Sequence, residues 1–177
     1  MSTYHEELKN KETLRLREIQ KELPAFTQTF FRGIAQTTST KTRLAYAYDL
    51  RIFFRYLYEE HRTLGGVETK DLTAEHLNEV SSEDIDAFME YLSYYIRTDE
   101  ENPELGKELQ NEEKGKSRKL AAVRMLFKYF YKVKSISANP AVFSYRTVSN
   151  PSPFISSPLI KSENQSFTRS QNTLGPF

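Results

Sequence analysis

Apolar residues recur at helical spacing along most of the chain, and no stretch alternates with the period of two that marks a half-buried strand. The clearest example runs from Ser39 to His61, where apolar residues fall at i, i+3, i+7 and i+10. These residues are Ala47, Leu50, Phe54 and Leu57. Ser39 is a suitable N-cap and Gly65 and Gly66 follow, so the pattern predicts a long amphipathic helix between them.

Two further stretches show the same four-residue stripe. After Ser81, which forms a potential capping box with Asp84, a helix is predicted to end near Arg97. Its stripe consists of Ile85, Phe88, Leu92 and Tyr95. The second stretch covers residues 114–134 and ends at the sequence SISANP. Its stripe consists of Leu120, Val123, Phe127 and Phe130.

The first forty residues predict two shorter elements. A helix from about Glu6 to Leu23 would bury Leu16, Ile19 and Leu23, and Pro24 would end it. The aromatic stretch AFTQTFFRGIA then predicts a short helix that closes at Gly33 or just after it. The chain is therefore expected to be all-α, with four to five helices.

The remaining segments lack periodicity. Residues 98–113 are acidic and contain Pro and Gly, so we expect an exposed loop. Residues 142–177 are rich in Ser, Asn and Pro, which predicts a linker or a disordered C-terminal tail. We therefore divide the chain into an N-terminal amphipathic helix (1–23), a helical domain (24–141) and this tail.

Composition excludes several classes of protein. The chain has no Cys, which excludes disulfides and thiol catalysis and fits a cytoplasmic location. No apolar run is long enough to span a membrane, and the N-terminus does not resemble a secretory signal. The three histidines, His5, His61 and His76, are too scattered for a metal site, so they are expected to be exposed surface residues. No cofactor-binding motif is present.

Charge is unevenly distributed in a chain whose net charge is only +1. Residues 65–113 hold fifteen Asp or Glu and three Lys or Arg, a net charge of −12, so the rest of the chain carries +13. The stretch 114–134 holds eight Lys or Arg and no acidic residue. Such segregation suggests that a polyanion binds one side of the molecule, although a basic helix face is as often only solvated.

A helical wheel separates the two faces of the basic stretch. Arg118, Ala121, Ala122, Met125, Lys128 and Lys132 lie opposite the apolar stripe, and Arg124 lies at the margin. Two small alanines among the cations would allow close approach to a phosphate backbone. Lys116, Ser117 and Arg118 are expected at the helix N-terminus, where free N–H groups also favour an anion.

Three segments, in order, resemble the core-binding domain of the tyrosine recombinases, the family of the phage integrases. The first has the pattern Ser-x-x-Thr-x-x-x-Tyr-x-x-Asp-Leu-x-x-Phe-x-x-x-Leu, filled by Ser39, Thr42, Tyr46, Asp49, Leu50, Phe53 and Leu57. The sequence VSSEDIDAFMEYL is similar to the middle helix. The closing helix is matched by Arg118, Leu120, Ala122, Arg124, Phe127, Tyr129 and the exit Asn139, Pro140 and Ala141.

The resemblance implies a SAM-like helical bundle that covers half of a double-stranded DNA site, with contacts to other recombinase protomers. It implies that DNA contacts come from two helices. They are Ser39, Lys41, Thr42 and Arg43 from the first, and Lys116, Ser117, Arg118, Lys119, Arg124 and Lys128 from the last. Tyr46, Asp49 and Leu50 are expected to be structural. For Thr42, position N3 of a capped helix is an equally good interpretation.

The catalytic signature of that family is missing from the sequence. None of the three histidines begins a His-x-x-Arg motif, so we predict no catalytic residues and no enzymatic activity. The chain resembles a DNA-binding portion alone, as a natural truncation, a frameshift or an engineered fragment would. A helical protein–protein interaction module is the alternative function, with the acidic middle region as the partner surface.

Overall fold

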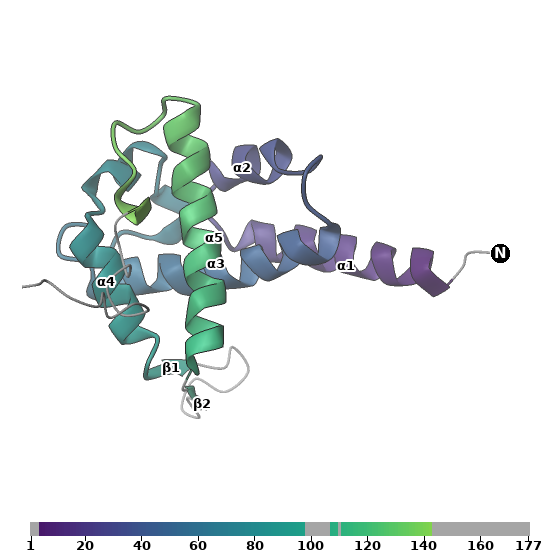
Figure 1. Cartoon of the computed structure of the whole chain (residues 1–177), viewed down its shortest axis with the longest axis horizontal. Helices are drawn as coiled ribbons and strands as arrows, with labels where there is room; N and C mark the ends of the chain where they lie inside the picture. The colour runs from purple at the N-terminus through teal and green to yellow at the C-terminus, as the bar shows by residue number, and fades with distance from the viewer. Residues whose placement is uncertain (1–3, 98–106, 110, 143–177) are drawn as a thin grey trace, which may run out of the picture. The chain divides into compact units, whose positions relative to one another are not determined.

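The apolar stripes become buried helix faces in the computed structural model of the chain, which describes residues 4–97, 107–109 and 111–142 (Figure 1). The α-helices are α1 (Tyr4–Lys21), α2 (Thr27–Gly33), α3 (Thr40–Glu60), α4 (Ser82–Tyr91) and α5 (Glu113–Lys132). Short 3-10 turns are η1 (Thr69–Asp71), η2 (Glu75–Glu79) and η3 (Pro140–Val142). The predicted all-α class with four to five helices is confirmed, and the described residues form five α-helices.

All described residues belong to one compact unit, residues 1–146. Helix α1 packs against α3, and its Leu16 and Ile19 are buried together with Leu23 just beyond it, as the sequence predicted. Helix α5 crosses α3 and also contacts α2 (Figure 1). The predicted tail, residues 142–177, lies outside the described residues except for Val142.

The end of the fourth helix was predicted wrongly. Helix α4 ends at Tyr91, and Tyr95–Arg97 forms strand β1, which pairs antiparallel with β2 (Lys107–Leu109). Aromatic and β-branched residues such as Tyr94, Tyr95 and Ile96 favour a strand over a helix. The Tyr95 ring stays buried and stacks on Tyr91 at 5.4 Å between centroids, so the helical and extended forms bury the same side chain. The hairpin occupies part of the predicted acidic loop, of which residues 98–106 and 110 lie outside the described residues.

Phe53 lies at the centre of the core, where α3, α4 and α5 meet. Its ring centroid is 5.1 Å from that of Phe88 in α4 and 6.2 Å from that of Phe127 in α5, and both contacts are edge-on. All three side chains are completely buried. The predicted stripes of α3, α4 and α5 are buried as well, because aromatic and aliphatic residues at these spacings share one helix face.

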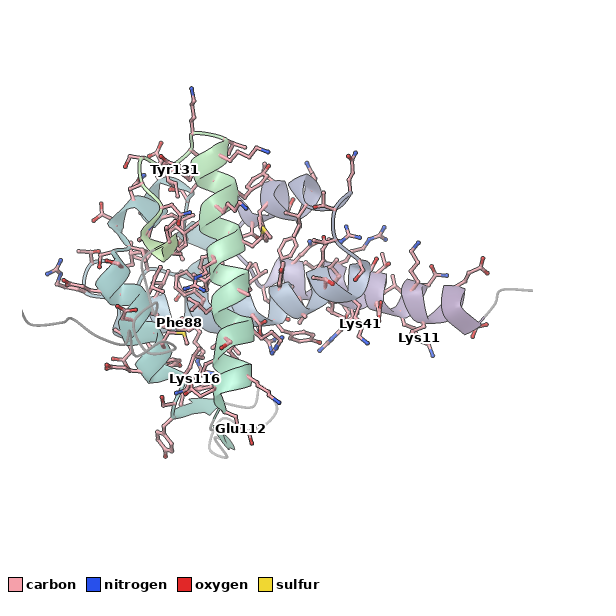
Figure 2. All side chains as sticks on the ribbon, in the orientation of Figure 1. Lys11, Lys41, Phe88, Glu112, Lys116 and Tyr131 are labelled. Carbon is pink, nitrogen blue, oxygen red and sulfur yellow. The ribbon has the colours of Figure 1, made fainter. Side chains whose placement is uncertain are left out.

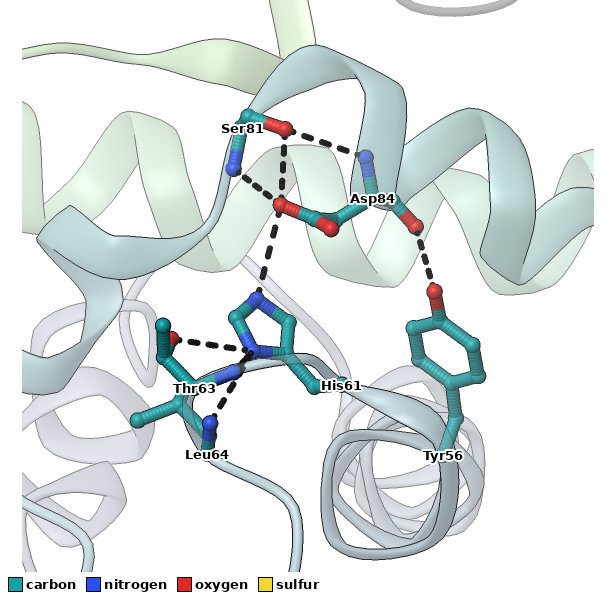
Figure 3. Close-up of polar contacts among 6 residues, drawn as sticks. All are labelled: Tyr56, His61, Thr63, Leu64, Ser81 and Asp84. Carbon is teal, nitrogen blue, oxygen red and sulfur yellow. Dashed lines mark hydrogen bonds and ion pairs between the residues drawn. The ribbon is translucent and has the colours of Figure 1, made fainter.

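A buried histidine joins the end of α3 to the start of α4 (Figure 3). The His61 side chain is only 2% exposed, and its Nδ1 accepts the backbone N–H groups of Thr63 and Leu64 at 3.2 and 3.1 Å. Because Nδ1 is an acceptor, the ring proton lies on Nε2, 3.4 Å from Oδ2 of Asp84. The same Oδ2 accepts the backbone N–H and the hydroxyl of Ser81, which confirms the predicted capping box.

The expectation of exposed histidines is therefore wrong for His61. It also fails for His76, which is half-buried and accepts the Thr73 backbone N–H at 3.0 Å. In both histidines, Nδ1 accepts a backbone N–H group of a turn in place of a backbone carbonyl. A search of the sequence for His-x-x-Arg motifs does not show such a contact. The His5 side chain lies outside the described residues.

We predict that Asp84→Ala destabilises the fold more than Ser81→Ala. Loss of an N-cap hydroxyl costs about 1 kcal/mol. Loss of Asp84 also removes the carboxylate that lies 3.4 Å from the buried Nε2 of His61, which makes no hydrogen bond with a described residue, and this adds about 1 kcal/mol. Urea unfolding followed by circular dichroism measures both changes. Glu83→Ala, at an exposed position in the same helical turn, should change the free energy of unfolding by less than about 0.5 kcal/mol, and an equal effect of Asp84→Ala would contradict the bridging role.

Candidate nucleic-acid interface

The first turn of α3 is closed by Ser39. Its side-chain oxygen accepts the backbone N–H of Thr42 at 3.1 Å, and the two hydroxyls lie 2.9 Å apart. Thr42 therefore occupies position N3 of a capped helix, which was the alternative to a DNA contact in the sequence analysis. Both hydroxyls already have a partner, and each can still accept a further hydrogen bond from or donate one to a ligand.

The predicted contacts of this turn face two directions. Thr42, Tyr46 and Asp49 share the stripe of α3 that leads to α5. Arg43 follows Thr40, which is buried, and its Nη2 donates to Oγ1 of Thr40 at 3.2 Å. Lys41 is exposed and no residue that the structure describes is paired with it (Figure 2). The four predicted residues of this helix thus do not form one surface.

The N-terminus of α5 differs from the expectation. The helix begins at Glu113, and the backbone N–H of Lys116 is already bonded to the carbonyl of Glu112 at 3.0 Å. Nζ of Lys116 also lies 3.1 Å from the Glu113 carboxylate. Lys116, Ser117 and Arg118 therefore do not lie at free N–H groups, because two glutamates occupy the end of the helix dipole instead.

Arg118 forms the one ion pair between α3 and α5 among the residues that the structure describes. Its Nη1 lies 2.8 Å from Oδ2 of Asp49, whose side chain is 1% exposed while that of Arg118 is 51% exposed. The expected structural role of Asp49 holds, but its partner is on another helix and not local. Oδ1 of Asp49 has no hydrogen-bond partner among the described residues. Burial raises the pKa of Asp49 to about 6, although the charges of Arg118 and Lys119 oppose this.

Lys119 lies in the interior and not on the DNA-facing surface. It is 5% exposed, and its Nζ donates to Oδ1 of Asn111 at 2.6 Å. Burial lowers the pKa of its ammonium group, whereas the charge of Asp49 raises it. The resemblance therefore assigned a DNA contact to Lys119, which is one position after Arg118 on the helix and points inward.

The outer face of α5 carries the remaining predicted residues. Ser117 and Lys128 are exposed, and Arg124 is half-buried with its Nε donating to the carbonyl of Ala141 at 3.1 Å. Of the two alanines, Ala121 is exposed but Ala122 is completely buried, so only one offers close approach to a ligand. The labels Lys116 and Tyr131 lie near the two ends of α5 in Figure 2.

The structure brings Arg118 beside α3, so the two basic segments meet at one crossing. Thr40 precedes Asp49 by nine residues and Glu113 precedes Arg118 by five. At 1.5 Å per residue, the starts of α3 and α5 lie about 14 Å and about 8 Å from the ion pair. The exposed cations of the two helices are Lys41, Lys114, Arg118, Lys128 and Lys132.

Two arginines that the sequence did not single out lie near Arg43. Arg17 of α1 and Arg32 of α2 line the same cleft as Arg43. Both arginines fall outside the recombinase-like patterns. The sequence could have indicated them only through their positions opposite the apolar residues of α1 and α2. Arg51 and Arg55 of α3 are instead paired with Glu22 and Glu59 at 2.7 and 2.6 Å.

The acidic region forms an exposed surface of its own on η1, η2 and α4. Its exposed carboxylates are Glu68, Asp71, Glu75, Glu79, Glu83, Asp86 and Glu90. Within the described ranges, no three acidic or histidine side chains are placed to hold a metal ion. No helix of the described part is both long and apolar enough to cross a membrane.

Comparison of the chain with protein-family models, with curated protein sequences and with solved structures finds no match. The resemblance to tyrosine recombinases is therefore a resemblance of the sequence patterns given above and of nothing else.

We predict that the stability difference between the parent chain and Asp49→Asn changes with pH. The folded-state pKa of about 6 lies above the ordinary value of 3.8, so between these values the folded chain holds a proton that the unfolded chain releases. The stability that this proton contributes is present below about pH 4 and is lost as the pH rises through 6. The free energy of unfolding of the parent minus that of the variant should therefore fall by about 2 kcal/mol between pH 4 and pH 7.

Urea unfolding at several pH values measures this difference. Asn has the same shape and keeps an acceptor for Arg118, so the variant is expected to fold. A difference that rises with pH would contradict the prediction and would show that attraction to Arg118 outweighs burial.

Proposed function

We propose that the chain binds duplex DNA with the outer face of α5 and the first turn of α3, in the manner of the core-binding domain of a tyrosine recombinase. The observation that carries the proposal is the charge of the α5 face: from Lys114 to Lys134 it holds no acidic residue, and Lys114, Lys128 and Lys132 are exposed. Exposed cations along one helix face can neutralise phosphates of a duplex.

The contacts within the protein support the same assignment. Asp49 belongs to the first recombinase-like pattern and Arg118 to the closing pattern, and they are paired at 2.8 Å. Arg124 and Ala141, both in the closing pattern, are joined by a hydrogen bond. Residues that belong to the recombinase-like patterns therefore contact one another and help to hold the helices in one arrangement. This is expected if the resemblance reflects a common architecture.

The acidic surface on η1, η2 and α4 favours one orientation on DNA, because phosphates are repelled from it. It also favours the second candidate function, a helical module that binds a basic protein partner. Under that alternative, duplex DNA would bind no better than another polyanion of similar charge density. The proposed role involves no catalytic step by this chain, since the sequence supplies no His-x-x-Arg motif.

We expect duplex DNA affinity to fall steeply with salt, and to fall less steeply in the variant Lys41→Gln, Lys128→Gln. This variant removes one exposed cation from each helix. Each lost phosphate contact should lower the slope of log affinity against log salt by about 0.9, so two lower it by about 2. Fluorescence anisotropy over a salt series measures the slope. Arg118 and Arg124 are poorer probes, because replacing them also removes contacts to Asp49 and Ala141.

The matched control is Lys9→Gln, Lys70→Gln, which removes the same charge from exposed positions outside the proposed surface. This control should bind DNA with the affinity and slope of the parent. Equal loss in both double variants would reduce the interaction to net charge, and a parent that ignores duplex DNA at low salt would overturn the proposal. Binding to heparin as tight as to DNA would favour the interaction module.

A further inference from the structure

A cleft of about 290 Å³ lies between α1, α2 and the start of α3. Each element contributes one arginine to it: Arg17 from α1, Arg32 from α2 and Arg43 from α3. Gln20 and Gln28 add two side-chain amides, and the rest of the lining is apolar or hydroxyl-bearing. No Asp or Glu lines it.

The arginines of the cleft differ from others in the described part of the chain. Arg15, Arg51, Arg55 and Arg118 are each paired with a carboxylate at 2.6–2.9 Å. Arg17 and Arg32, in contrast, make no hydrogen bond or ion pair with any residue that the structure describes.

Arg43 is the most constrained of the three arginines. Its Nη2 donates to Thr40, while its Nε is buried and has no hydrogen-bond partner among the described residues. A buried N–H group normally has an acceptor, because leaving it unpaired is unfavourable. Three positive charges also line one cleft, and a bound anion reduces the repulsion among them. The cleft therefore has the charge of an anion site. The free donors that a ligand can reach are those of Arg17 and Arg32, because Nε of Arg43 is inaccessible to solvent.

We propose that this cleft binds a phosphate group, carried either by a small phosphorylated molecule or by a nucleic-acid backbone. Guanidinium groups present planar pairs of N–H donors that match the oxygens of phosphate, and three of them can surround a dianion. The cleft is at the small end of ligand sites, which fits a phosphate or a diphosphate better than a large organic molecule. The first turn of α3, at Thr40, adds the favourable end of a helix dipole.

The site is separate from the α5 face, so the inference goes beyond the proposed DNA-binding function and does not depend on it. Only Arg43 belongs to both the cleft and the predicted DNA contacts. Arg17 and Arg32 are therefore the residues to change. Both are exposed, so their replacement by Gln should leave the fold intact, which circular dichroism and the urea midpoint would check.

The test is calorimetric titration of pyrophosphate into the full chain, beside the variant Arg17→Gln, Arg32→Gln. The parent should bind pyrophosphate saturably with one site, and the variant at least about tenfold more weakly, because two of three guanidinium groups are gone. The control Lys11→Gln, Lys21→Gln removes the same charge from exposed positions of α1 that do not line the cleft (Figure 2 labels Lys11), and it should bind as the parent does.

A DNA arm distinguishes the two sources of phosphate. If the Arg17→Gln, Arg32→Gln variant also loses duplex affinity and pyrophosphate displaces DNA from the parent, the cleft holds a backbone phosphate. If DNA binding is unchanged while pyrophosphate binding is lost, the ligand is a small phosphorylated molecule. Unsaturable binding to the parent, or equal binding to both double variants, would overturn the inference whatever the result with Lys41 and Lys128.

Discussion

The arrangement of α3 and α5 depends on the ion pair between Asp49 and Arg118 at the point where the two helices cross. A carboxylate that is 1% exposed would be very unfavourable without a partner, so Asp49 requires a cation from α5 at this position. The aromatic contacts of Phe53 with Phe88 and Phe127 supply most of the apolar burial nearby, but they are less directional. The pair therefore orients α5 on α3 without adding net stability, because burial still raises the pKa of Asp49 to about 6, and the apolar core supplies the stability around it.

This constraint also determines which cations remain for a ligand. Arg118 directs one nitrogen inward and leaves the rest of its guanidinium half-exposed, while Lys119 turns fully inward to Asn111. The basic character of the sequence from 114 to 134 thus serves two purposes. Part of it neutralises the interior around Asp49. The part that faces outward beyond the first turn, such as Lys128 and Lys132, has no acidic residue nearby on its own helix.

Periodicity predicted the fold well because each helix buries one continuous stripe, and a local pattern is enough to find it. Residues that depend on distant partners were predicted poorly. Lys119 was assigned to the surface because its burial depends on Asn111, eight residues earlier and beyond the start of the helix. His61 was assigned to the surface because its partner, Asp84, lies on the next helix. The hairpin was missed because Tyr95 satisfies a helical stripe as well as a strand.

The first turn of α3 connects the two sites that we propose. Thr42 lies on the stripe of α3 that leads to Asp49 and the α5 crossing, whereas Thr40 and Arg43 lie on the stripe that lines the cleft with α1 and α2. Successive residues of a helix point about 100° apart, so this single capped turn presents its polar groups in two directions. The groups on both sides share the same backbone and the same Ser39 cap, so the cap positions the groups of both proposed sites.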